Sequence, residues 1–237
     1  MTIKIQNIGD VVPDWETVPA PLHQAMHGQY SEVLPLDIEK HAKELFEANA
    51  KDIHNEMWTY MSYGPFESLA TYKSWMQNTC CSTDPLFYVI SNKKQALGLS
   101  SYLRIDTQNG VIEIGHLVFS PALQHSRVAT EALFLMLDYA FNLGYRRVEW
   151  KCNALNNASR SAALRLGMTF EGILRQTNVV KGRNRDTAWY SMLDKEWPMI
   201  KNAFTQWLNP LNFDENGLQK SKLSLLTATC KQNLMSI

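Results

Sequence analysis

The sequence predicts a mixed α/β fold, in which helices flank a central and mostly antiparallel sheet. Apolar segments of strand and helix character alternate along the chain, with a strand, a buried helix, a strand, a helix and two more strands in succession. Short polar turns separate the earlier strands, as in a meander. The 237 residues are 45% hydrophobic and 19% charged, so the chain has enough apolar side chains for a large core.

The N-terminal third predicts an irregular arm followed by two helices. Residues 1–29 contain three prolines and little periodicity, which is typical of an arm that lies along a domain. From Tyr30 the chain alternates as a strand, and Asp37 is placed to cap a helix over residues 38–50. Four apolar residues would form the buried stripe of that helix: Leu36, Ala42, Leu45 and Phe46. A second helix is predicted over residues 66–77.

The middle of the chain predicts the sheet and its central helix. Strands over residues 86–90, 97–105 and 111–119 have short polar turns between them, which predicts an antiparallel meander. Residues 130–142 are apolar nearly all round and form a buried helix that Gly144 ends. A strand over 147–152 then leads to Asn156, which caps a helix ending at Gly167.

The last elements are two strands over residues 168–170 and 187–193, joined by a polar hairpin around Gly182, and a helix over 197–208. Residues 209–237 have a weak pattern and are expected to form a tail. The predicted organisation is therefore an N-terminal arm over 1–29, a catalytic-type domain over 30–197 and a C-terminal helical extension or tail over 198–237.

The net charge of zero is the sum of segments with opposite charge. Residues 1–100 have no arginine and a net charge of −5, whereas residues 146–185 have a net charge of +7. The overall balance argues against a dedicated nucleic-acid binder, which is usually basic. The basic segment could surround the phosphates of a ligand, contact RNA or a ribosomal partner, or be a solvated surface.

The cysteines and histidines favour a reducing compartment and no metal site. The four cysteines form no CxxC pair, and the six histidines form no HxxxH pair or Cys/His ligand spacing. The N-terminus lacks a basic region followed by an apolar one, and the most apolar stretch, residues 132–143, is too short to span a bilayer. We expect a cytoplasmic protein with no membrane partner.

Two junctions between a strand and a helix predict a ligand site. The first joins the strand ending at Phe119 to the helix that starts near Val128, and the second joins the strand ending at Cys152 to the helix capped by Asn156. The first N–H groups of a helix lack intrahelical partners and attract anions. Two adjacent parallel strands that each end at a helix can hold an extended ligand between them. An ordinary strand–helix turn is the alternative for each junction.

The residues of these junctions resemble a known family. The run EIG-x-LVF-x-P-x-LQ-x-x-x-x-ATEA, followed by LGYRR-x-EWKC-x-x-x-N-x-x-S-R and RLGM, is similar to the GCN5-related N-acetyltransferases, on the branch of ribosomal-protein N-terminal acetyltransferases. The resemblance covers about residues 30–197 and depends on the combination of these elements. It implies an acyl-CoA N-acyltransferase fold whose sheet opens at the site of acetyl-CoA.

The resemblance implies which residues bind acetyl-CoA. The family's pyrophosphate motif falls on Gln124, Arg127 and Ala129, and the preceding strand would bind the pantetheine arm. The full set of expected acetyl-CoA contacts is Leu117, Val118, Phe119, Gln124, His125, Ser126, Arg127, Val128, Ala129, Thr130, Asn156 and Arg160. Arg165 is an alternative partner of the 3′-phosphate. Arg127 replaces a glycine of the motif, so its side chain must either point outward or bind phosphate itself.

Attack of an amine on a thioester needs a base and an acid for the leaving thiolate. Glu113 corresponds to the family's base, and its apolar neighbours predict partial desolvation. The alternative is a structural Glu113 paired with an arginine. His116 is a second candidate base, disfavoured because simple alternation puts it with Ile114 and Val118 on the face opposite to Glu113, Gly115, Leu117 and Phe119. Ser159 matches the family's thiolate acid, and a hydroxyl bonded to backbone is its alternative.

The sequence therefore predicts an acetyl-CoA-dependent N-acetyltransferase that acts on a primary amine in a ternary complex, with no metal. The amine could belong to a protein N-terminus or to a small molecule, and the chain is compatible with a homodimer. A second hypothesis is a catalytically degenerate member of the family that binds an acyl-CoA or a partner. A third, an RNA-binding module, would show affinity that falls steeply with salt.

Overall fold

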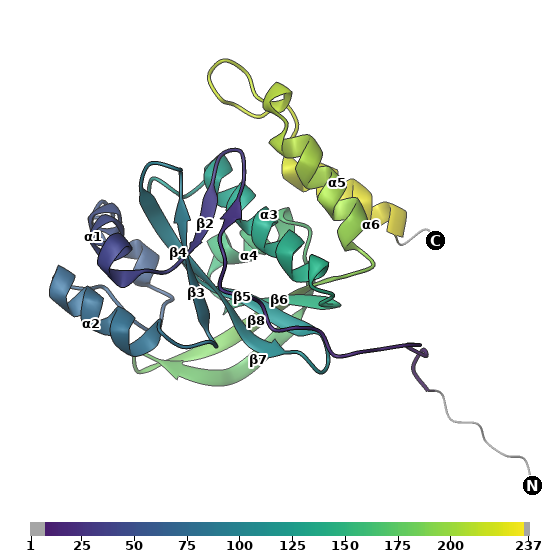
Figure 1. Ribbon diagram of the computed structural model, residues 1–237, viewed down its shortest axis with the longest axis horizontal. Helices are drawn as coiled ribbons and strands as arrows, with labels where there is room; N and C mark the ends of the chain where they lie inside the picture. The colour runs from purple at the N-terminus through teal and green to yellow at the C-terminus, as the bar shows by residue number, and fades with distance from the viewer. Residues whose placement is uncertain (1–7, 235–237) are drawn as a thin grey trace, which may run out of the picture.

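One eight-stranded sheet organises residues 8–234, the part of the chain that the computed structural model describes. Its strand order is β1-β2-β3-β4-β5-β6-β8-β7 (Figure 1). Neighbouring strands are antiparallel except for β5 and β6, which are parallel. The strands are β1 Met26–His27, β2 Glu32–Pro35, β3 Leu86–Ser91, β4 Ala96–Asp106, β5 Val111–Phe119, β6 Arg147–Asn153, β7 Thr169–Val180 and β8 Arg183–Leu193. The predicted mixed α/β class with a mostly antiparallel sheet is confirmed.

Helices α1 (Ile38–Asn49) and α2 (Leu69–Thr79) cover one face of the first strands, with the short 3₁₀ helix η1 (Glu56–Trp58) between them (Figure 1). The Asp37 carboxylate accepts hydrogen bonds from the amides of Glu39 and Lys40, which fixes the start of α1 as predicted. Ser68 caps α2 in the same way. The core on this face is made of buried side chains from both helices and from β3–β5, which include Ala42, Leu45, Tyr72, Met76, Phe87, Val89, Leu99 and Val118.

Helices α3 (Arg127–Asn142) and α4 (Asn157–Arg165) cover the opposite face. The apolar surface of α3 packs on Ile112, Ile114 and Val148, which are fully buried or nearly so. Helices α5 (Trp197–Leu208) and α6 (Leu223–Leu234) form a further layer outside α3 and α4 (Figure 1), with the 3₁₀ helix η2 (Pro210–Asn212) in their connection. Phe134 of α3 stacks against Trp197 and Phe204 of α5.

Several sequence predictions are confirmed closely. The meander β3–β5, the parallel arrangement of β5 and β6, the cap at Asn156 and the extent of α5 are as expected. Two differ. The strands after α4 are far longer than expected, because β7 and β8 continue to the tip of the hairpin with many polar residues. Residues 223–234, expected in a tail, form α6, whose Leu223 and Thr227 are buried against the molecule.

The N-terminal arm follows the surface without regular structure between residues 8 and 25. The indole N–H of Trp15 donates to the carbonyl oxygen of Gln108 at 2.9 Å, and the amide of Val18 donates to that of Thr107 at 3.1 Å. The arm is therefore anchored on the turn between β4 and β5. Its first seven residues lie outside the described part of the chain.

Candidate active site

Strands β5 and β6 separate half-way along their length, and this separation defines the site. They are paired at three positions, from Val111 with Arg147 to Glu113 with Glu149. Beyond these pairs β5 continues beside β4 to Phe119, whereas β6 continues beside β8 to Asn153. Helices α3 and α4 begin just after the two diverging ends (Figure 1). The backbone edges of β5 and β6 that face each other in this opening are therefore available to a ligand.

A β-bulge shifts the side chains of β5 at the opening. On β4, Leu99 and Ser101 pair with Val118 and Gly115, so β5 has one more residue than β4 over this interval, and His116 has a φ of 50°. The prediction from simple alternation is therefore wrong beyond Gly115. Leu117 and Phe119 pack toward the core under α3, whereas Val118 joins Glu113 on the face of α1 and α2.

His116 consequently lies on the same face as Glu113, which reverses the reason for disfavouring it. Its ring stacks on Tyr63 and lies 4.9 Å from the ring centroid of Phe87. Its Nδ1 is 3.1 Å from the Tyr63 hydroxyl. Burial, together with the positive charges of Arg104 and Arg185, lowers the pKa of His116 to about 4. The imidazole is therefore neutral at neutral pH.

The loop between β5 and α3 presents free backbone amides. Ser126 caps α3 by accepting from the amide of Ala129 at 3.0 Å. Among the described residues, no group accepts a hydrogen bond from the amides of His125, Arg127 and Val128. His125 has a φ of 55°, which turns consecutive N–H groups toward one side as in an anion-binding nest. These amides fit a pyrophosphate, as the resemblance implies.

Gln124 lies in the second half of this loop and contacts the preceding strand. Its side-chain amide donates to the carbonyl oxygen of Phe119 at 2.9 Å. That carbonyl is at the end of β5, on the part of the strand whose backbone is expected to form hydrogen bonds with the pantetheine arm. Gln124 therefore holds the end of β5 against the loop.

The side chain of Arg127 points away from the loop amides. Its guanidinium lies between two aromatic rings, 4.9 Å from the centroid of Tyr30 and 4.3 Å from that of Phe213. Its backbone is in the first turn of α3, with no positive φ that would require glycine. Of the two options that the sequence left open, the structure shows the outward one, and it links α3 to the C-terminal extension.

The start of α4 brings Asn156 and Ser159 to the opening. The Asn156 side-chain oxygen accepts from the amide of Ser159 at 3.0 Å. The indole N–H of Trp150 donates to the Ser159 hydroxyl oxygen at 3.0 Å. Because an indole can only donate, the hydroxyl hydrogen of Ser159 remains available to another acceptor.

The two basic residues of α4 lie in different places. The Arg160 guanidinium donates to the Tyr190 hydroxyl and to the carbonyl oxygen of Ala154. Arg165 donates to the Thr130 hydroxyl at 3.1 Å and lies over the Trp207 ring, and burial lowers its pKa. Because that hydroxyl itself donates to the carbonyl oxygen of Ser126, Arg165 lies beside the first turn of α3, whereas Arg160 is held at β8 and the end of β6.

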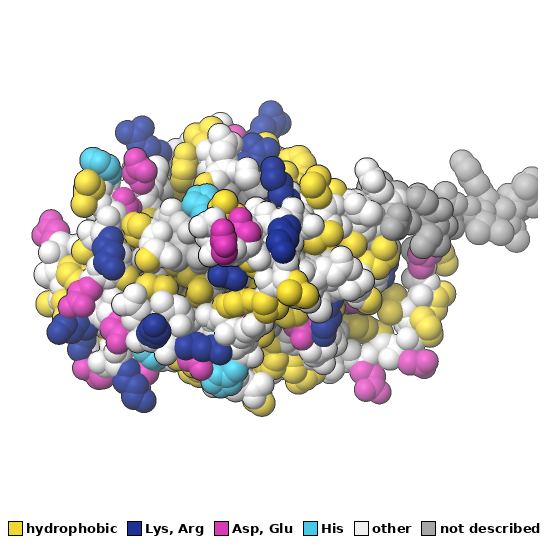
Figure 2. Space-filling view, turned by 90° about the horizontal axis from the view of Figure 1, so that it is seen from above, with side chains coloured by type: hydrophobic (Ala, Val, Ile, Leu, Met, Phe, Trp, Pro, Cys, Tyr) yellow, Lys and Arg dark blue, Asp and Glu magenta, His cyan; other side chains and the backbone are white. Residues whose placement is uncertain are grey.

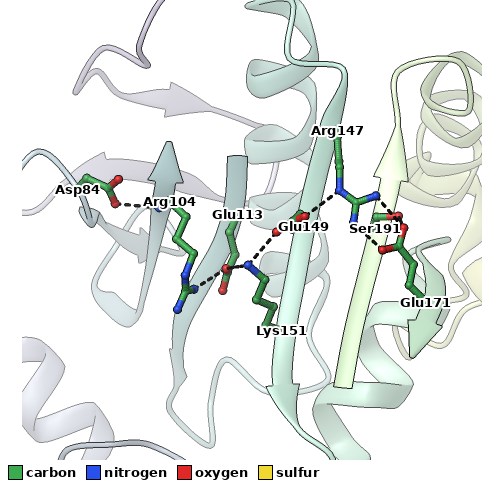
Figure 3. A network of polar contacts seen from close by, with 8 residues as sticks. All are labelled: Asp84, Arg104, Glu113, Arg147, Glu149, Lys151, Glu171 and Ser191. Atoms are coloured by element: carbon green, nitrogen blue, oxygen red, sulfur yellow. Dashed lines mark hydrogen bonds and ion pairs between the residues drawn. The ribbon is translucent and has the colours of Figure 1, made fainter. Parts of the chain in front are cut away.

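Glu113 of β5 is the centre of a network of ion pairs that extends from β4 to β7 (Figure 3). Its Oε2 lies 2.6 Å from Arg104 and 2.9 Å from Lys151, and Lys151 also contacts Glu149 at 2.8 Å. The network continues through Arg147 to Glu171 and Ser191. We call the surface formed by these residues and Trp189 the charged face. It lies opposite α3 and α4.

The other oxygen of Glu113, Oε1, accepts no hydrogen bond from the described residues. It lies toward Gly115, two residues beyond the last pair of β5 and β6, where a Cβ would come within 3.3 Å of Oε1 and 2.9 Å of Leu103, so the glycine lets the carboxylate and Leu103 pack closely over the strand. Only 5% of the Glu113 side chain is exposed, which agrees with the predicted desolvation. The pairing with an arginine that the sequence offered as an alternative is also present. One oxygen is held by cations and the other is free for chemistry.

Three comparisons with known proteins now identify the family. A family model described as an acetyltransferase (GNAT) domain matches residues 34–169, more than half of the chain. The chain belongs to the GNAT acetyltransferase family. A crystal structure of a GCN5-related N-acetyltransferase from Brucella melitensis is 42% identical and superposes with a TM-score of 0.89, covering 92% of this chain and all of that one.

Two bacterial relatives indicate which branch of the family this acetyltransferase resembles. The uncharacterized N-acetyltransferase p20 of Bacillus licheniformis is 26% identical over 150 residues, which are 60% of this chain and 83% of the relative. A Bacillus subtilis protein named as a ribosomal N-acetyltransferase, YdaF, is 31% identical over 101 residues, which are 42% of this chain and 55% of the relative. The ribosomal-type branch that the sequence resembles is thereby supported, and the protein is an acyltransferase of this fold.

Sequence reasoning missed several residues of the site. Tyr63, Arg104 and Lys151 reach it only through tertiary contacts, and no local pattern marked them.

In the described part of the chain, no helix is long and apolar enough to cross a membrane, and no cluster of ligating side chains is placed to hold a metal. Figure 2 shows one face of the acetyltransferase, on which basic and acidic side chains are interspersed although the sequence separates them.

Proposed function

We propose that this acetyltransferase transfers the acetyl group of acetyl-CoA to a primary amine, in a complex that holds both substrates at once. One observation carries the proposal: the opening between β5 and β6 has free helix amides on one side and the free oxygen of Glu113 on the other. The amides of His125, Arg127 and Val128 suit a pyrophosphate. The edge of β5 from Leu117 to Phe119 suits the pantetheine arm, with Asn156 opposite.

Glu113 is proposed as the base for the amine. The two cations on Oε2 keep the carboxylate oriented, and Oε1 accepts the proton from the amine nitrogen as the new C–N bond forms. When the C–S bond breaks, Ser159 donates its hydroxyl proton to the departing thiolate and is reprotonated from solvent. His116, which is neutral and on the same face, is the second candidate for the base.

The alternative of a catalytically degenerate protein loses its main support. It depended on Arg127 blocking the approach of phosphate, and the Arg127 side chain lies between Tyr30 and Phe213 instead. Arg160 stays in the proposed set of acetyl-CoA contacts only if its guanidinium leaves Tyr190 on binding. On the face drawn in Figure 2, basic and acidic side chains are interspersed, which does not favour RNA binding by that face.

The proposal also assigns a role to each segment of the chain and a cellular location to the protein. The arm over residues 1–29 and the extension over 198–237 would support a catalytic domain over 30–197. The four cysteines are free thiols, which suits the reducing cytoplasm, and a homodimer remains compatible with the fold.

Two measurements test the proposal together. Calorimetry should detect acetyl-CoA binding at micromolar ligand, and a panel of primary amines should give release of free CoA thiol. A protein that binds no acetyl-CoA would contradict the whole proposal. The degenerate alternative would be restored if the protein binds acetyl-CoA but releases no CoA thiol with any of the amines offered, whether a protein N-terminus, a polyamine, an amino acid or an antibiotic amine.

A further inference from the structure

Strand β8 presents two buried donors that have no hydrogen-bond partner among the described residues. They are the Nε of Arg185 and the indole N–H of Trp189. Both residues are an even number of positions from Ser191, so their side chains share its face of β8. Lys151 pairs with Trp189 across the sheet and its Nζ lies 3.8 Å from the Trp189 ring, which places both donors on the charged face. Buried donors without a partner are rare and call for an explanation.

Arg185 is also a partly buried cation of this face that makes no ion pair with a carboxylate of the described residues. Arg104, Lys151 and Arg147 are paired with Glu113, Glu149 and Glu171. Arg185 has no ion pair among the described residues. A guanidinium offers up to five donors in a planar fork that matches carboxylate and phosphate groups. The unmatched charge and the unpartnered Nε therefore point to the same missing partner, an anion.

Arg185 lies near the end of β6, where the opening begins to widen. Thr187 of β8 pairs with Asn153, the last residue of β6, and Arg185 is two residues away from Thr187, beyond that end. After burial and Arg104, the charge of Arg185 also contributes to the lowered pKa of His116 on β5. The tip of the β7–β8 hairpin is held against residues 58–60, because Lys181 donates to the carbonyl oxygen of Trp58 at 2.9 Å, and Tyr60 donates to the carbonyl oxygen of Leu155 at 3.1 Å. Arg185 therefore lies between the end of β6 and this tip, on the same face of the sheet as Glu113.

We propose that the acceptor is an amine that also carries an acidic group, carboxylate or phosphate, and that Arg185 binds this group while the amine faces Glu113. The proposal rests on the proposed function, since it assumes that the amine is acetylated at this opening. The indole N–H of Trp189 is a second donor for an oxygen of the same acceptor. The pyrophosphate of acetyl-CoA is assigned to the amides at the start of α3 and its 3′-phosphate to the arginines of α4, which leaves Arg185 free.

A matched set of acceptors tests this. Ethanolamine, serine and O-phosphoethanolamine share the amine and differ in the acidic group, and the C-terminally amidated dipeptides Ser-Asp-NH2 and Ser-Asn-NH2 add a pair that differs only in the side-chain carboxylate. We expect kcat/KM for the acidic members to exceed that for their neutral partners by about tenfold or more, as a charged hydrogen bond requires. Serine and O-phosphoethanolamine separate carboxylate from phosphate.

Arg185→Gln should remove this preference by raising the KM of the acidic acceptors, while the KM of acetyl-CoA stays the same. Arg185→Lys should keep part of it, because lysine retains the charge but not the fork. Arg175→Gln on β7 is the matched control, since Arg175 is an exposed arginine of the same hairpin. Equal kcat/KM for acidic and neutral acceptors, or a rise in the KM of acetyl-CoA alone, would overturn the proposal.

A binding measurement keeps the test independent of turnover. Calorimetry of O-phosphoethanolamine and of serine on the CoA-saturated protein should show affinities about tenfold weaker in Arg185→Gln for at least one of them. The same affinity in both proteins, or no binding to either, contradicts the acidic acceptor. Loss of acetyl-CoA binding itself would instead contradict the proposed function.

Discussion

The two halves of the sheet differ in what covers the face opposite α3. Over β3, most of β4 and the end of β5 that face is closed by apolar side chains of α1 and α2, such as Leu45 and Tyr72. From Arg104 of β4 and Glu113 of β5 across β6 and β8 to β7 the corresponding surface is the charged face, where Lys151 and Glu113 are 8% and 5% exposed. Burying charges costs desolvation, and replacing such networks by apolar residues is often neutral or stabilising. The first half therefore stabilises the fold, and the charged face has to be explained by function.

The strongest test of this difference is the substitution Glu113→Gln. It keeps the shape of the side chain but removes the base, so kcat should fall by about 10²–10⁴-fold while acetyl-CoA still binds. Thiol release and calorimetry measure the two effects. Glu47→Gln on α1, which is exposed, is the matched control and should leave kcat unchanged. Unchanged transfer by the Glu113 variant would remove Glu113 from the mechanism and leave His116 as the candidate.

A substitution under α1 and α2 should have the opposite effect: it should lower the stability of the fold and leave kcat unchanged. Leu45 on α1 is fully buried, and Leu45→Ala should lower the free energy of unfolding by about 2–5 kcal/mol through lost burial and a cavity. Because Leu45 is assigned neither to the proton transfer nor to acetyl-CoA binding, kcat per folded molecule should be retained. Chemical denaturation followed by the tryptophan signal gives the first value and initial rates give the second. A large loss of kcat at full folding would show that the apolar half also takes part in catalysis.

His116 lies at the boundary between the halves and predicts a pH dependence. Its pKa is lowered to about 4 in the folded protein, below the 6.5 of an ordinary histidine, so the unfolded chain binds more protons between these values. The stability is complete above pH 6.5 and is lost as the pH falls toward 4. From pH 7.5 to 5 the loss should be about 2 kcal/mol.

His116→Gln should remove this part of the pH dependence. The buried His41 shifts in the same direction and remains in both proteins, so the difference between the two denaturation series isolates His116. An exposed histidine replaced in the same way, His54→Gln, is the control. Equal pH dependence in the wild type and the His116 variant would show that the ring is protonated without cost in the folded state.

The same comparison explains which features the sequence could predict. Elements with a strong local pattern, such as the capped helix after Asp37 and the meander, were predicted nearly to the residue. The length of β7 was not, because an edge strand with mostly exposed residues has no apolar alternation to reveal it.

Within the site, the two helix junctions were accessible because each has a local signature. The bulge at His116 was not, since one inserted residue depends on pairing with β4 and leaves no mark in composition. Lys151 and Arg104 were missed for a related reason. They meet Glu113 from neighbouring strands, and such pairs depend on the register of the sheet.

The smallest effect is expected for a substitution at the edge of the charged face. It tests whether residues far from Glu113 in the network also affect catalysis. Glu171 makes two hydrogen bonds with Arg147, at 2.7 and 2.6 Å, and its side chain is 40% exposed. Hydrogen bonds from Arg147 lower the pKa of Glu171, so the pair stabilises the fold above the ordinary pKa of a glutamate and loses this contribution as the pH falls. Solvent screens an exposed pair, and Arg147 keeps Glu149 as a partner. Glu171→Gln should therefore lower the free energy of unfolding by about 1 kcal/mol or less, with kcat unchanged. A loss of kcat comparable to that of Glu113→Gln would mean that the whole network, and not its inner end at Glu113, sets the proton chemistry of the opening.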